Sequence, residues 1–435
     1  MIRQAVIGAG GSGTRMAGVL PDKPKILAEI SGRTLLEHSL VNLSQFGIQK
    51  VHLLLGVFAD QVISSIPNLR SIFELDITYS VESSPLGTAG SILNASAFLE
   101  DSFLFFYGDL YINTDFTEIL EALENPGVEF AQLVHPSNHV FDSDLIISND
   151  QSLILGYLVK PHPPELVFNN LSNAGVYAFR KRLFSHDLTL KFSSKIDLDK
   201  ELLPYFVANG VQGKTCRNYG FVRDAGTPSR LNEINEKYIN GSLAMSSRPA
   251  IFLDRDGTLN IPNGHITVPE NFEIYPDVGP FISMANRAGY WVIVITNQPV
   301  IARGEASMND LKLIHAKFES EIARDNAYVD AIFVCPHHPH SGFPNEIREL
   351  KFSCTCRKPE IGLFQNAIQQ FGINIEKSFF IGDSWRDEEA ASKVSIKFIR
   401  MNRTGIESSI IHPSHIPFEI QSLDPSLFEL MIQQD

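Results

Sequence analysis

Strand-length apolar runs alternate with helix-like patterns in two successive blocks of this chain, and this alternation constrains the fold more than any other feature. In the first block the runs are "QAVIGAG", "KVHLLLG" and "FLFFYGD", with helix-like patterns such as "TLLEHSLVNLSQFG" between them. In the second block they are "AIFLDRDG", "YWVIVITN", "VDAIFVC" and "SFFIGD", separated by patterns such as "MNDLKLIHAKFESEIARD". Such alternation is typical of β-α-β units around a mostly parallel sheet. We therefore expect two α/β domains.

The length supports the same division. A chain of 435 residues exceeds what one hydrophobic core usually supports. The polar, small-residue-rich stretch "INGSLAMSSRP" precedes a new strand and marks the boundary. We predict a first domain over residues 1–240, a linker over 241–248, a second domain over 249–405 and an irregular C-terminal arm over 406–435.

Composition and charge exclude several classes of protein. With 44% hydrophobic and 20% charged residues, the chain has the composition of an ordinary globular protein. A net charge of −14 argues against broad binding to nucleic acid or to an anionic membrane, which clustered Lys and Arg would require. The first residues lack the features of a signal peptide, and no apolar run reaches the length of a membrane span. We expect a cytoplasmic protein with small-molecule partners and leave its oligomeric state open.

A glycine-rich turn follows the first strand-like run, and a lysine follows the turn. Glycines let backbone N–H groups approach an anion closely, and a nearby cation would neutralise a triphosphate. For the glycines alone, a plain tight turn is an equally good interpretation. The candidate phosphate-binding residues are Gly10, Gly11, Gly13, Thr14, Arg15 and Lys25.

"AGGSGTRM" followed by "KPKIL" resembles the opening signature of the sugar-1-phosphate nucleotidylyltransferases, and the resemblance continues through the first half of the chain. It implies a Rossmann-like, GT-A-like domain with a mixed sheet. "ESSPLGTAGSI", with Gly87, resembles the base- and sugar-recognition loop, and "LSNAGVYAF", with Asn173, the sugar-contacting strand. Lys160 in "LVKP" resembles the lysine that meets the sugar phosphate, although a solvated surface lysine remains the alternative.

The same resemblance supplies a pair of metal-binding acids. Asp109 in "FYGDLYINTDF" resembles the first metal-binding aspartate, and Asp224 in "VRDAGTPSRL" the second. The implied reaction is attack of a sugar phosphate on the α-phosphorus of a nucleoside triphosphate with loss of pyrophosphate, in which positioning and charge neutralisation dominate. The two carboxylates would hold Mg²⁺, while Arg15 and Lys25 would neutralise the phosphates.

"IFLDRDGTLN" opens the second half with two acids at strand spacing. Residues i and i+2 of a strand project to the same side, so Asp254 and Asp256 can address one ligand. Two carboxylates sharing a site repel each other unless a cation lies beside them or one is protonated. Gly257 permits the sharp turn that follows.

The motif "DRDGTLN" resembles the first motif of the haloacid dehalogenase-type (HAD-type) phosphatases, and the other motifs follow in order. They are "VIVITN" ending at Thr296 and Asn297, "CRKP" with Lys358, and "FFIGDSWRD" with Asp383 and Asp387. The resemblance implies a HAD-like parallel sheet, an Asp254 nucleophile and an Asp256 general acid/base. Mg²⁺ would be held by Asp254, Asp383 and the Asp256 carbonyl, and Lys358 and Thr296 would complete the phosphate cradle.

A cluster of soft ligands lies between the second and third of these motifs. Cys335 and His337 are followed, after sixteen residues, by Cys354 and Cys356. Three thiolates and an imidazole complete a tetrahedral Zn²⁺ shell without a water, which predicts a structural site. His338 and His340 are rivals to His337 that spacing cannot separate, and resemblance to the zinc-loop phosphatases favours His337.

The zinc-loop branch includes D-glycero-D-manno-heptose 1,7-bisphosphate phosphatases and histidinol-phosphate phosphatases. "TNQPVIARG" is similar to a stretch of the heptose enzymes, which implies that Arg303 meets the distal phosphate, and Arg357 is a further substrate-binding candidate. Pro299-Val300 replaces the expected Ser-Gly, and Ser384 stands where the heptose enzymes often carry lysine. Both departures concern substrate preference.

These inferences combine into a bifunctional enzyme of nucleotide-activated heptose synthesis, a precursor route for lipopolysaccharide, capsule or S-layer glycans. The second half would remove the C7 phosphate of a heptose 1,7-bisphosphate, and the first would join heptose 1-phosphate to a nucleotide, with GTP as the expected donor. One alternative is a histidinol-phosphate phosphatase fused to a transferase for another sugar, such as mannose 1-phosphate. Another is an active phosphatase with a non-catalytic sugar-nucleotide sensor domain.

Overall fold

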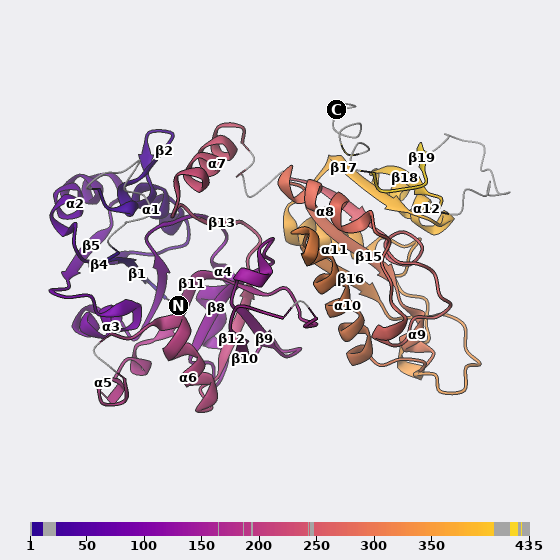
Figure 1. Ribbon diagram of the computed structural model, residues 1–435, viewed down its shortest axis with the longest axis horizontal. Coiled ribbons are helices and arrows are strands. Elements are labelled where there is room, and N and C mark those ends of the chain that lie inside the picture. Colours follow the sequence, from indigo (N-terminus) through magenta and orange to yellow (C-terminus); the bar gives the residue numbers. More distant parts are fainter. Residues whose placement is uncertain are drawn as a thin grey trace. The chain divides into compact units, whose positions relative to one another are not determined.

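The computed structural model describes residues 2–11, 23–163, 165–185, 187–192, 195–241, 243, 248–403, 418–424 and 428 (Figure 1). The chain forms two compact units. The first comprises Met1–His135, Asp144–Lys160 and Leu171–Met245, and the second Pro136–Ser143, Pro161–Asn170 and Ser246–Asp435. The second unit thus includes two segments of the first half, whereas the boundaries at residues 240 and 249 remain sequence-based predictions.

The first unit is built on a mixed sheet that has nine strands among the described residues. Seven of them follow the order β10-β9-β11-β6-β1-β4-β5, and β8 pairs with both β11 and β12. β1 is parallel to β4 and β6, whereas β11 is antiparallel to β6, β8 and β9. The mixed sheet predicted for this half is confirmed. The strands are β1 (Gln4–Ala9), β4 (Lys50–Leu55), β5 (Asp76–Val81), β6 (Ser102–Tyr107), β8 (Phe130–His135), β9 (Leu145–Ser148), β10 (Ile154–Leu158), β11 (Ser172–Arg180) and β12 (Gly213–Arg217).

Helices and two small strand pairs complete this unit. α1 begins with a capping box, in which Thr34 and Glu37 satisfy each other's backbone N–H groups, and it buries Leu36, Leu40 and Leu43 from one face. The helices are α1 (Leu35–Gln45), α2 (Ala59–Phe73), α3 (Gly87–Asn94), α4 (Thr117–Glu121), α5 (Asp187–Lys191), α6 (Leu203–Ala208) and α7 (Pro228–Ile239), with short helical turns η2 (Lys25–Leu27), η3 (Ser96–Phe98), η4 (Ala122–Glu124), η6 (Lys181–Leu183) and η7 (Leu198–Leu202). The small pairs are β2 (Glu29–Ile30) with β3 (Arg33–Thr34), and β7 (Leu110–Asn113) with β13 (Phe221–Asp224).

The β7–β13 pair matters because it joins two distant parts of the sequence. Asp224 on β13 lies opposite Leu110 on β7, and the Ala225 N–H donates to the Asp109 carbonyl at 2.8 Å. This register brings the two acids singled out in the first half to one end of the same pair of strands.

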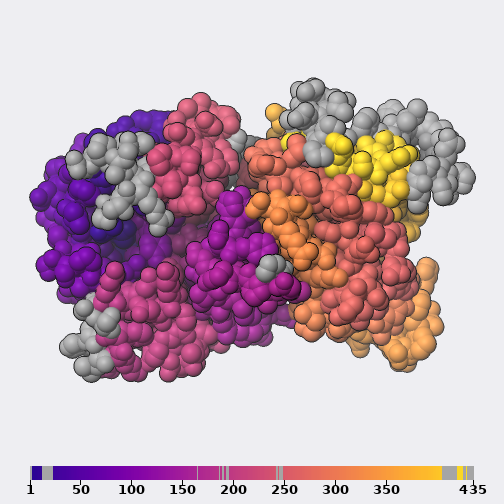
Figure 2. Space-filling view, viewed as in Figure 1, coloured from indigo at the N-terminus to yellow at the C-terminus, as the bar shows by residue number. Residues whose placement is uncertain are grey.

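The second unit is built on a sheet with the strand order β16-β15-β14-β17-β18-β19, in which every neighbouring pair is parallel. Ile251, Phe252 and Leu253 are fully buried, as expected for a strand covered on both faces. The predicted parallel sheet is confirmed. The strands are β14 (Pro249–Leu253), β15 (Trp291–Asn297), β16 (Ala331–Cys335), β17 (Asn374–Gly382), β18 (Lys397–Met401) and β19 (Phe418–Ile420). In the space-filling view, the yellow surface comes from the last described segments of this unit (Figure 2).

The helices of the second unit connect these strands. They are α8 (Val278–Arg287), α9 (Pro299–Ala302), α10 (Met308–Ile322), α11 (Gly362–Phe371) and α12 (Trp385–Val394), with turns η5 (Val140–Asp142), η8 (Pro269–Asn271), η9 (Ala323–Asp325) and η10 (Arg348–Leu350). Within this unit the Phe168 N–H donates to Ser320 Oγ on α10 at 2.9 Å. Nowhere in the described chain is a helix long and apolar enough to cross a membrane.

The C-terminal arm contributes to the core of the second unit. Where the sequence predicts an irregular arm, Phe418–Ile420 form a strand beside β18, and Leu423 and Phe428 are buried. The Phe428 ring packs edge-on against Tyr290, with ring centres 5.3 Å apart. The arm therefore stabilises the sheet that carries the second unit's site.

Replacing Phe428 with alanine should lower the free energy of unfolding of the second unit by about 3 kcal/mol, because a buried aromatic ring is lost and a cavity remains. Denaturant unfolding followed by tryptophan fluorescence measures this change. Leu313→Ala on the exposed face of α10, where the side chain is 46% exposed, is the matched control and should cost less than about 1 kcal/mol. An equal loss for both variants would contradict the proposed packing of the arm.

Candidate active sites

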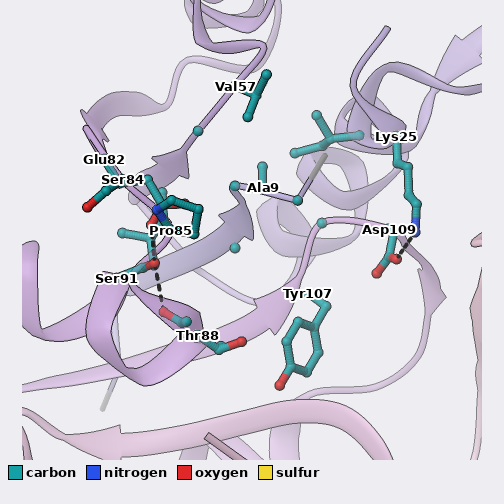
Figure 3. Close-up of a pocket in the computed structure, with 18 of the residues that line it drawn as sticks. Ala9, Lys25, Val57, Glu82, Ser84, Pro85, Thr88, Ser91, Tyr107 and Asp109 are labelled. Carbon is teal, nitrogen blue, oxygen red and sulfur yellow. Dashed lines mark hydrogen bonds and ion pairs between the residues drawn. The ribbon is translucent and has the colours of Figure 1, made fainter. Parts of the chain in front are cut away.

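A cavity of about 610 Å³ lies in the first unit at the carboxyl ends of β1 and β6. Five residues predicted from the sequence to hold nucleotide, sugar or metal line it, namely Gly10, Gly11, Lys25, Gly87 and Asp109. Figure 3 shows the Lys25–Asp109 pair at one end of the cavity and Glu82, Ser84 and Ser91 at the other. Gly13, Thr14 and Arg15 lie outside the described residues.

The two predicted metal-binding acids lie near each other, and of the two, Asp109 is among the described residues that line the cavity. Lys25 Nζ lies 3.0 Å from Asp109 Oδ2, and Arg230 Nη1 lies 2.5 Å from Asp224 Oδ1. A Cβ on Gly226 would come within 2.9 Å of Asp224 Oδ1 and 3.9 Å of Asp109 Oδ2, so both carboxylates border the same glycine. Each acid has a basic partner and a second oxygen, and hard oxygen donors of this kind suit Mg²⁺.

The opposite end of the cavity is shaped by Glu82. Its Oε2 accepts hydrogen bonds from the Ser91 hydroxyl at 2.8 Å and the Leu86 N–H at 3.3 Å. A Cβ on Gly10 would lie only 2.8 Å from Glu82 Oε1, so the absence of a side chain at Gly10 lets this carboxylate approach the turn. The recognition loop predicted around Gly87 therefore forms a wall of the cavity.

Asn173 lies in a buried polar cluster rather than among the residues that line the cavity. Its Nδ2 donates to Asp199 Oδ1 at 2.9 Å, and the Tyr177 hydroxyl donates to the same oxygen at 2.5 Å. The Tyr107 hydroxyl donates to Asp199 Oδ2 at 2.5 Å, and Tyr107 does line the cavity. Burial raises the pKa of Asp199, while the tyrosine hydroxyls oppose that shift. Asn173 is therefore connected to the cavity indirectly, because it binds Asp199, and Asp199 binds the cavity residue Tyr107.

Lys160 is exposed, and its backbone N–H donates to Asp144 Oδ1 at 3.0 Å. It is absent from the residues that line the cavity in the described chain. Its role at the sugar phosphate stays a prediction.

The second site assembles at the carboxyl ends of β14 and β17. Ligand oxygens of Asp254, Asp383 and Asp387 lie within 4.8 Å of one another. Lys358 Nζ lies 2.7 Å from Asp254 Oδ1 and 2.6 Å from Asp387 Oδ1, and it donates to the Ile295 carbonyl at 2.8 Å. Four residues predicted from three separate motifs therefore lie close together.

Burial controls the electrostatics of this cluster. Burial raises the pKa of Asp254, Lys358 opposes that rise, and the neighbouring carboxylates Asp387 and Asp383 add to it. Burial, and then the charge of Asp387, raise the pKa of Asp383 to about 6. Three acids with one lysine leave an excess of negative charge, so a divalent cation held by these carboxylate oxygens would favour their ionised forms. The donor set fits Mg²⁺.

The Asp256 carboxylate is held by Arg255 and Gln298. Both of its carboxylate oxygens accept from Arg255 Nη2, at 2.9 and 3.0 Å, and Oδ2 also accepts from Gln298 Nε2 at 2.7 Å. Its side chain does not join the grouped ligand atoms. The expected magnesium contact of its backbone carbonyl stays a prediction.

Thr296 and Asn297 end β15 beside this cluster. The Thr296 hydroxyl accepts from Gln298 Nε2 at 2.8 Å. The Asn297 side chain accepts from the Lys358 N–H at 3.0 Å and donates to the Lys358 carbonyl at 3.1 Å. Asn297 therefore fixes the backbone that carries the buried lysine.

The predicted metal clasp also assembles. Ligand atoms of Cys335, His337, Cys354 and Cys356 lie within 4.8 Å of one another, with His337 Nδ1 3.2 Å from Cys356 Sγ. His338 instead turns its Nε2 toward Arg303 Nη2 at 3.2 Å. Of the three candidate histidines, the geometry groups His337 with the thiols, and three sulfurs with one imidazole fit a closed Zn²⁺ shell.

Arg303 and Arg357 lie near the clasp. Arg303 Nη1 is 2.7 Å from His265 Nε2, and its guanidinium lies over the Phe343 ring. Arg357 Nη1 donates to the His337 carbonyl at 3.3 Å. Their contact with substrate phosphate stays a prediction.

Both departures from the heptose-enzyme pattern have a local role. Ser384, where lysine is often found, forms a capping box with Asp387 at the start of α12. Pro299 occupies the first turn of α9, where its missing N–H is tolerated, and Val300 is buried. All three residues therefore stabilise the segments that carry the site.

Sequence reasoning missed several residues that lie at these sites. Gln298 is buried beside the site. Its position directly after the Thr296-Asn297 motif was a usable sequence signal. Arg230, six positions after Asp224, could have been found as a basic residue on the following helix. Tyr107 lies two positions before Asp109 in a motif that was already singled out. Asp199 and Lys195 have no local sequence signal, because only the fold brings them to the cavity or its wall.

Comparisons with known proteins match the two halves of the chain to two different families. Residues 4–241 match the family described as nucleotidyl transferase, and residues 250–400 match the family described as polynucleotide kinase 3 phosphatase. The D-glycero-beta-D-manno-heptose-1,7-bisphosphate 7-phosphatase of Escherichia coli O6:H1 is 34% identical over 159 residues, which cover 37% of this chain and 82% of that protein.

Two solved structures are also similar. One is HddC from Yersinia pseudotuberculosis, with 24% identity and a TM-score of 0.46, over 55% of this chain and 100% of that chain. The other is the D,D-heptose 1.7-bisphosphate phosphatase from B. bronchiseptica complexed with magnesium and phosphate. It has 26% identity and a TM-score of 0.36, over 43% of this chain and 99% of that chain.

Replacing Gly257 with alanine should reduce the rate of phosphate release from p-nitrophenyl phosphate at least about tenfold. A rise of about 1.4 kcal/mol in the activation free energy is enough for this loss. Gly257 has a φ of +84°, and a Cβ there would lie 2.2 Å from Asp383 Oδ2. Gly264→Ala is the matched control, because φ is +60° but nothing lies within 4 Å of its Cβ position. Equal losses in the two variants would show that backbone strain, rather than displacement of Asp383, causes the defect.

Proposed function

The chain belongs to the nucleotidyl transferase family in its first half and to the family of D-glycero-beta-D-manno-heptose-1,7-bisphosphate 7-phosphatases in its second, and we propose that it performs two steps in the synthesis of a nucleotide-activated heptose. It is a bifunctional fusion of a nucleotidyltransferase and a HAD-type phosphatase. The proposal concerns the substrates, the product, the metals and the roles of the site residues.

We propose that the second half removes the C7 phosphate of D-glycero-D-manno-heptose 1,7-bisphosphate. The observation that carries this proposal is the 34% identity to a phosphatase of that name, combined with the meeting of Asp254, Asp383, Asp387 and Lys358. Arg303, whose guanidinium is partly desolvated by Phe343 and two histidines, is proposed to meet the distal phosphate, with Arg357 beside it.

In the proposed mechanism an Asp254 oxygen attacks the C7 phosphorus while the bond to the sugar oxygen breaks, which leaves an aspartyl-phosphate. Asp256 donates a proton to the departing sugar oxygen and then accepts a proton from the water that hydrolyses the intermediate. Lys358 and Thr296 stabilise charge on the phosphoryl oxygens. Mg²⁺ held by Asp254, Asp383 and the Asp256 carbonyl would supply charge neutralisation between nucleophile and phosphate.

We propose that the first half transfers a guanylyl group from GTP to the resulting heptose 1-phosphate and releases pyrophosphate. The bridging oxygen of the α-phosphate leaves as the sugar phosphate oxygen forms its bond to the α-phosphorus. Gly10, Gly11, Gly13 and Thr14 would cradle the phosphates, and Gly87 and Asn173 would lie at the base and sugar. Lys25 and Arg15 would neutralise phosphate charge, Lys160 would meet the sugar phosphate, and Mg²⁺ at Asp109 and Asp224 would add charge neutralisation.

The pairing of the two halves supports this assignment, since the product of the proposed phosphatase is the substrate of the proposed transferase. We also propose structural Zn²⁺ at the Cys/His clasp. A cytoplasmic location would keep the clasp thiols reduced and give access to GTP.

Separate inactivation of each half tests the proposed sequence of reactions. With heptose 1,7-bisphosphate, GTP and Mg²⁺, the wild type should release orthophosphate and then pyrophosphate, as phosphorus NMR will show. Asp109→Asn should release orthophosphate alone. Asp254→Asn should release neither, until heptose 1-phosphate is supplied, when it should release pyrophosphate.

The exposed acids Asp60 and Glu376 provide control variants, Asp60→Asn and Glu376→Gln, which should behave like the wild type. Competition among nucleotides identifies the base. Faster phosphate release from histidinol phosphate than from the heptose bisphosphate would replace the proposed substrate. Unchanged pyrophosphate release by Asp109→Asn would contradict the metal-binding role of that residue.

Removal of a clasp ligand tests the proposed zinc. Cys356→Ser should lose most bound zinc and lower phosphatase activity at least about tenfold. The clasp lies just before Lys358, and loss of a metal ligand removes several kcal/mol of the metal-binding free energy that stabilises the fold. Elemental analysis measures zinc, and Cys216→Ser, which changes a cysteine of the first unit that is not part of the clasp, is the control. Full zinc content or full activity in Cys356→Ser would contradict a structural zinc site.

A further inference from the structure

The Gln298 side chain bridges two groups of the phosphatase site that come from different strands. Its Nε2 donates to Asp256 Oδ2 at 2.7 Å and to Thr296 Oγ1 at 2.8 Å. Gln298 is only 2% exposed, so water does not compete freely for these hydrogen bonds. A single amide nitrogen thus contacts both the carboxylate after β14 and the hydroxyl near the end of β15.

Apart from Gln298, Asp256 depends on its neighbour for orientation. Arg255 is 1% exposed and contacts both carboxylate oxygens, while the Asp256 side chain itself remains 42% exposed. A carboxylate with two side-chain torsions and one open side can turn about the guanidinium contact. The Gln298 amide supplies a second, rigid contact on Oδ2.

The backbone of Gln298 is held independently of its side chain. Its N–H donates to the Cys335 carbonyl at 2.8 Å, and the preceding residue Asn297 pairs with Cys335 across β15 and β16. The next residues, Pro299 to Ala302, form α9 and bury Val300 and Ile301. A substitution at this side chain can therefore remove the amide while leaving the backbone position intact.

The NH₂ group of Gln298 satisfies both contacts at once. An amide nitrogen has two hydrogens, one for each oxygen, whereas a carboxylate of the same shape could donate to neither. A methionine has similar length and no donor, so it fills the space without either hydrogen bond.

We propose that Gln298 is a positioning residue that holds Asp256 in register with Thr296 for proton transfer to and from the substrate. This inference rests on the proposed phosphatase function. In the first step the Asp256 proton passes to the departing sugar oxygen as the phosphorus–oxygen bond breaks and Asp254 bonds to phosphorus. In the second step Asp256 takes a proton from water as the water oxygen bonds to phosphorus and the Asp254 bond breaks. Gln298 exchanges no proton.

Leaving-group dependence separates this role from a general structural one. A sugar alkoxide needs protonation to leave, whereas p-nitrophenolate leaves readily without a proton. Loss of Asp256 positioning should therefore slow formation of the aspartyl-phosphate from the sugar substrate, and it should spare its formation from p-nitrophenyl phosphate. Hydrolysis of the intermediate, which needs the base, should slow with both substrates.

The experiment compares full-length Gln298→Met with the wild type by rapid quench and stopped flow. With saturating heptose 1,7-bisphosphate, kcat should fall at least about tenfold, a fraction of what general acid/base catalysis contributes, with KM changed less than about threefold. With p-nitrophenyl phosphate, Gln298→Met should retain a rapid burst of one p-nitrophenol per enzyme followed by slow turnover. Gln365→Met on the exposed face of α11 is the control and should match the wild type.

Three results would overturn the inference. They are wild-type kinetics in Gln298→Met, loss of the p-nitrophenol burst together with sugar turnover, and a defect confined to KM. A wild-type chain that releases phosphate from neither substrate would instead remove the proposed function, and the inference with it. Pyrophosphate release by Gln298→Met from heptose 1-phosphate and GTP should be unchanged, which checks that the first half is folded, while the retained p-nitrophenol burst checks the second half.

Discussion

A buried lysine placed between two buried carboxylates is the interaction on which the second site depends. Lys358 is 2% exposed and pairs with Asp254 and Asp387, whose side chains are 12% and 0% exposed. Removing such charges from water costs several kcal/mol each, and only close pairing and additional hydrogen bonds offset that cost. The three side chains come from the end of β14, the segment before α11 and the start of α12. The site therefore exists only when these segments are packed.

The elements around the lysine explain how that packing is held. Asn297 binds the Lys358 backbone through both its side-chain oxygen and nitrogen, and the Cys/His clasp ends two residues before the lysine. Ser384 caps the helix that carries Asp387. Each of these contacts constrains one of the segments that carry the charged groups. Together they keep three charged groups within hydrogen-bonding distance.

The first unit also brings two carboxylates near each other, and there the acids and their basic partners are more exposed. Asp109 pairs with Lys25 and Asp224 with Arg230, and the β7–β13 register keeps both acids beside Gly226. Because these side chains are partly exposed, water screens their repulsion, and each pair contributes little stability by itself. At such a site an acid could exchange its basic partner for a metal ion at low cost, and a base could exchange its acid for a phosphate.

The sequence by itself determined the two α/β blocks, the mixed and parallel sheets, and the residues of the acidic cluster and the clasp. The two α/β blocks follow from local periodicity, and the grouping of the Cys/His ligands follows from their spacing. The mixed sheet of the first half and the acidic cluster of the second were implied by the resemblance of motifs such as "DRDGT" to known families. Lys25, Gly87 and Asp109, which were singled out from motifs and their family resemblance, line one cavity.

Only the tertiary structure decided which side chains contact one another across elements. It placed the Asp256 carboxylate against Arg255 and Gln298, and it placed Asn173 beside Asp199 rather than in the cavity lining. At the clasp it grouped His337 with the three thiols, as the resemblance had favoured and as spacing alone could not decide. It also built β19 and buried Phe428 from a tail without clear periodicity. The physical reason is that side-chain direction and burial depend on neighbours distant in sequence, which periodicity and spacing do not encode.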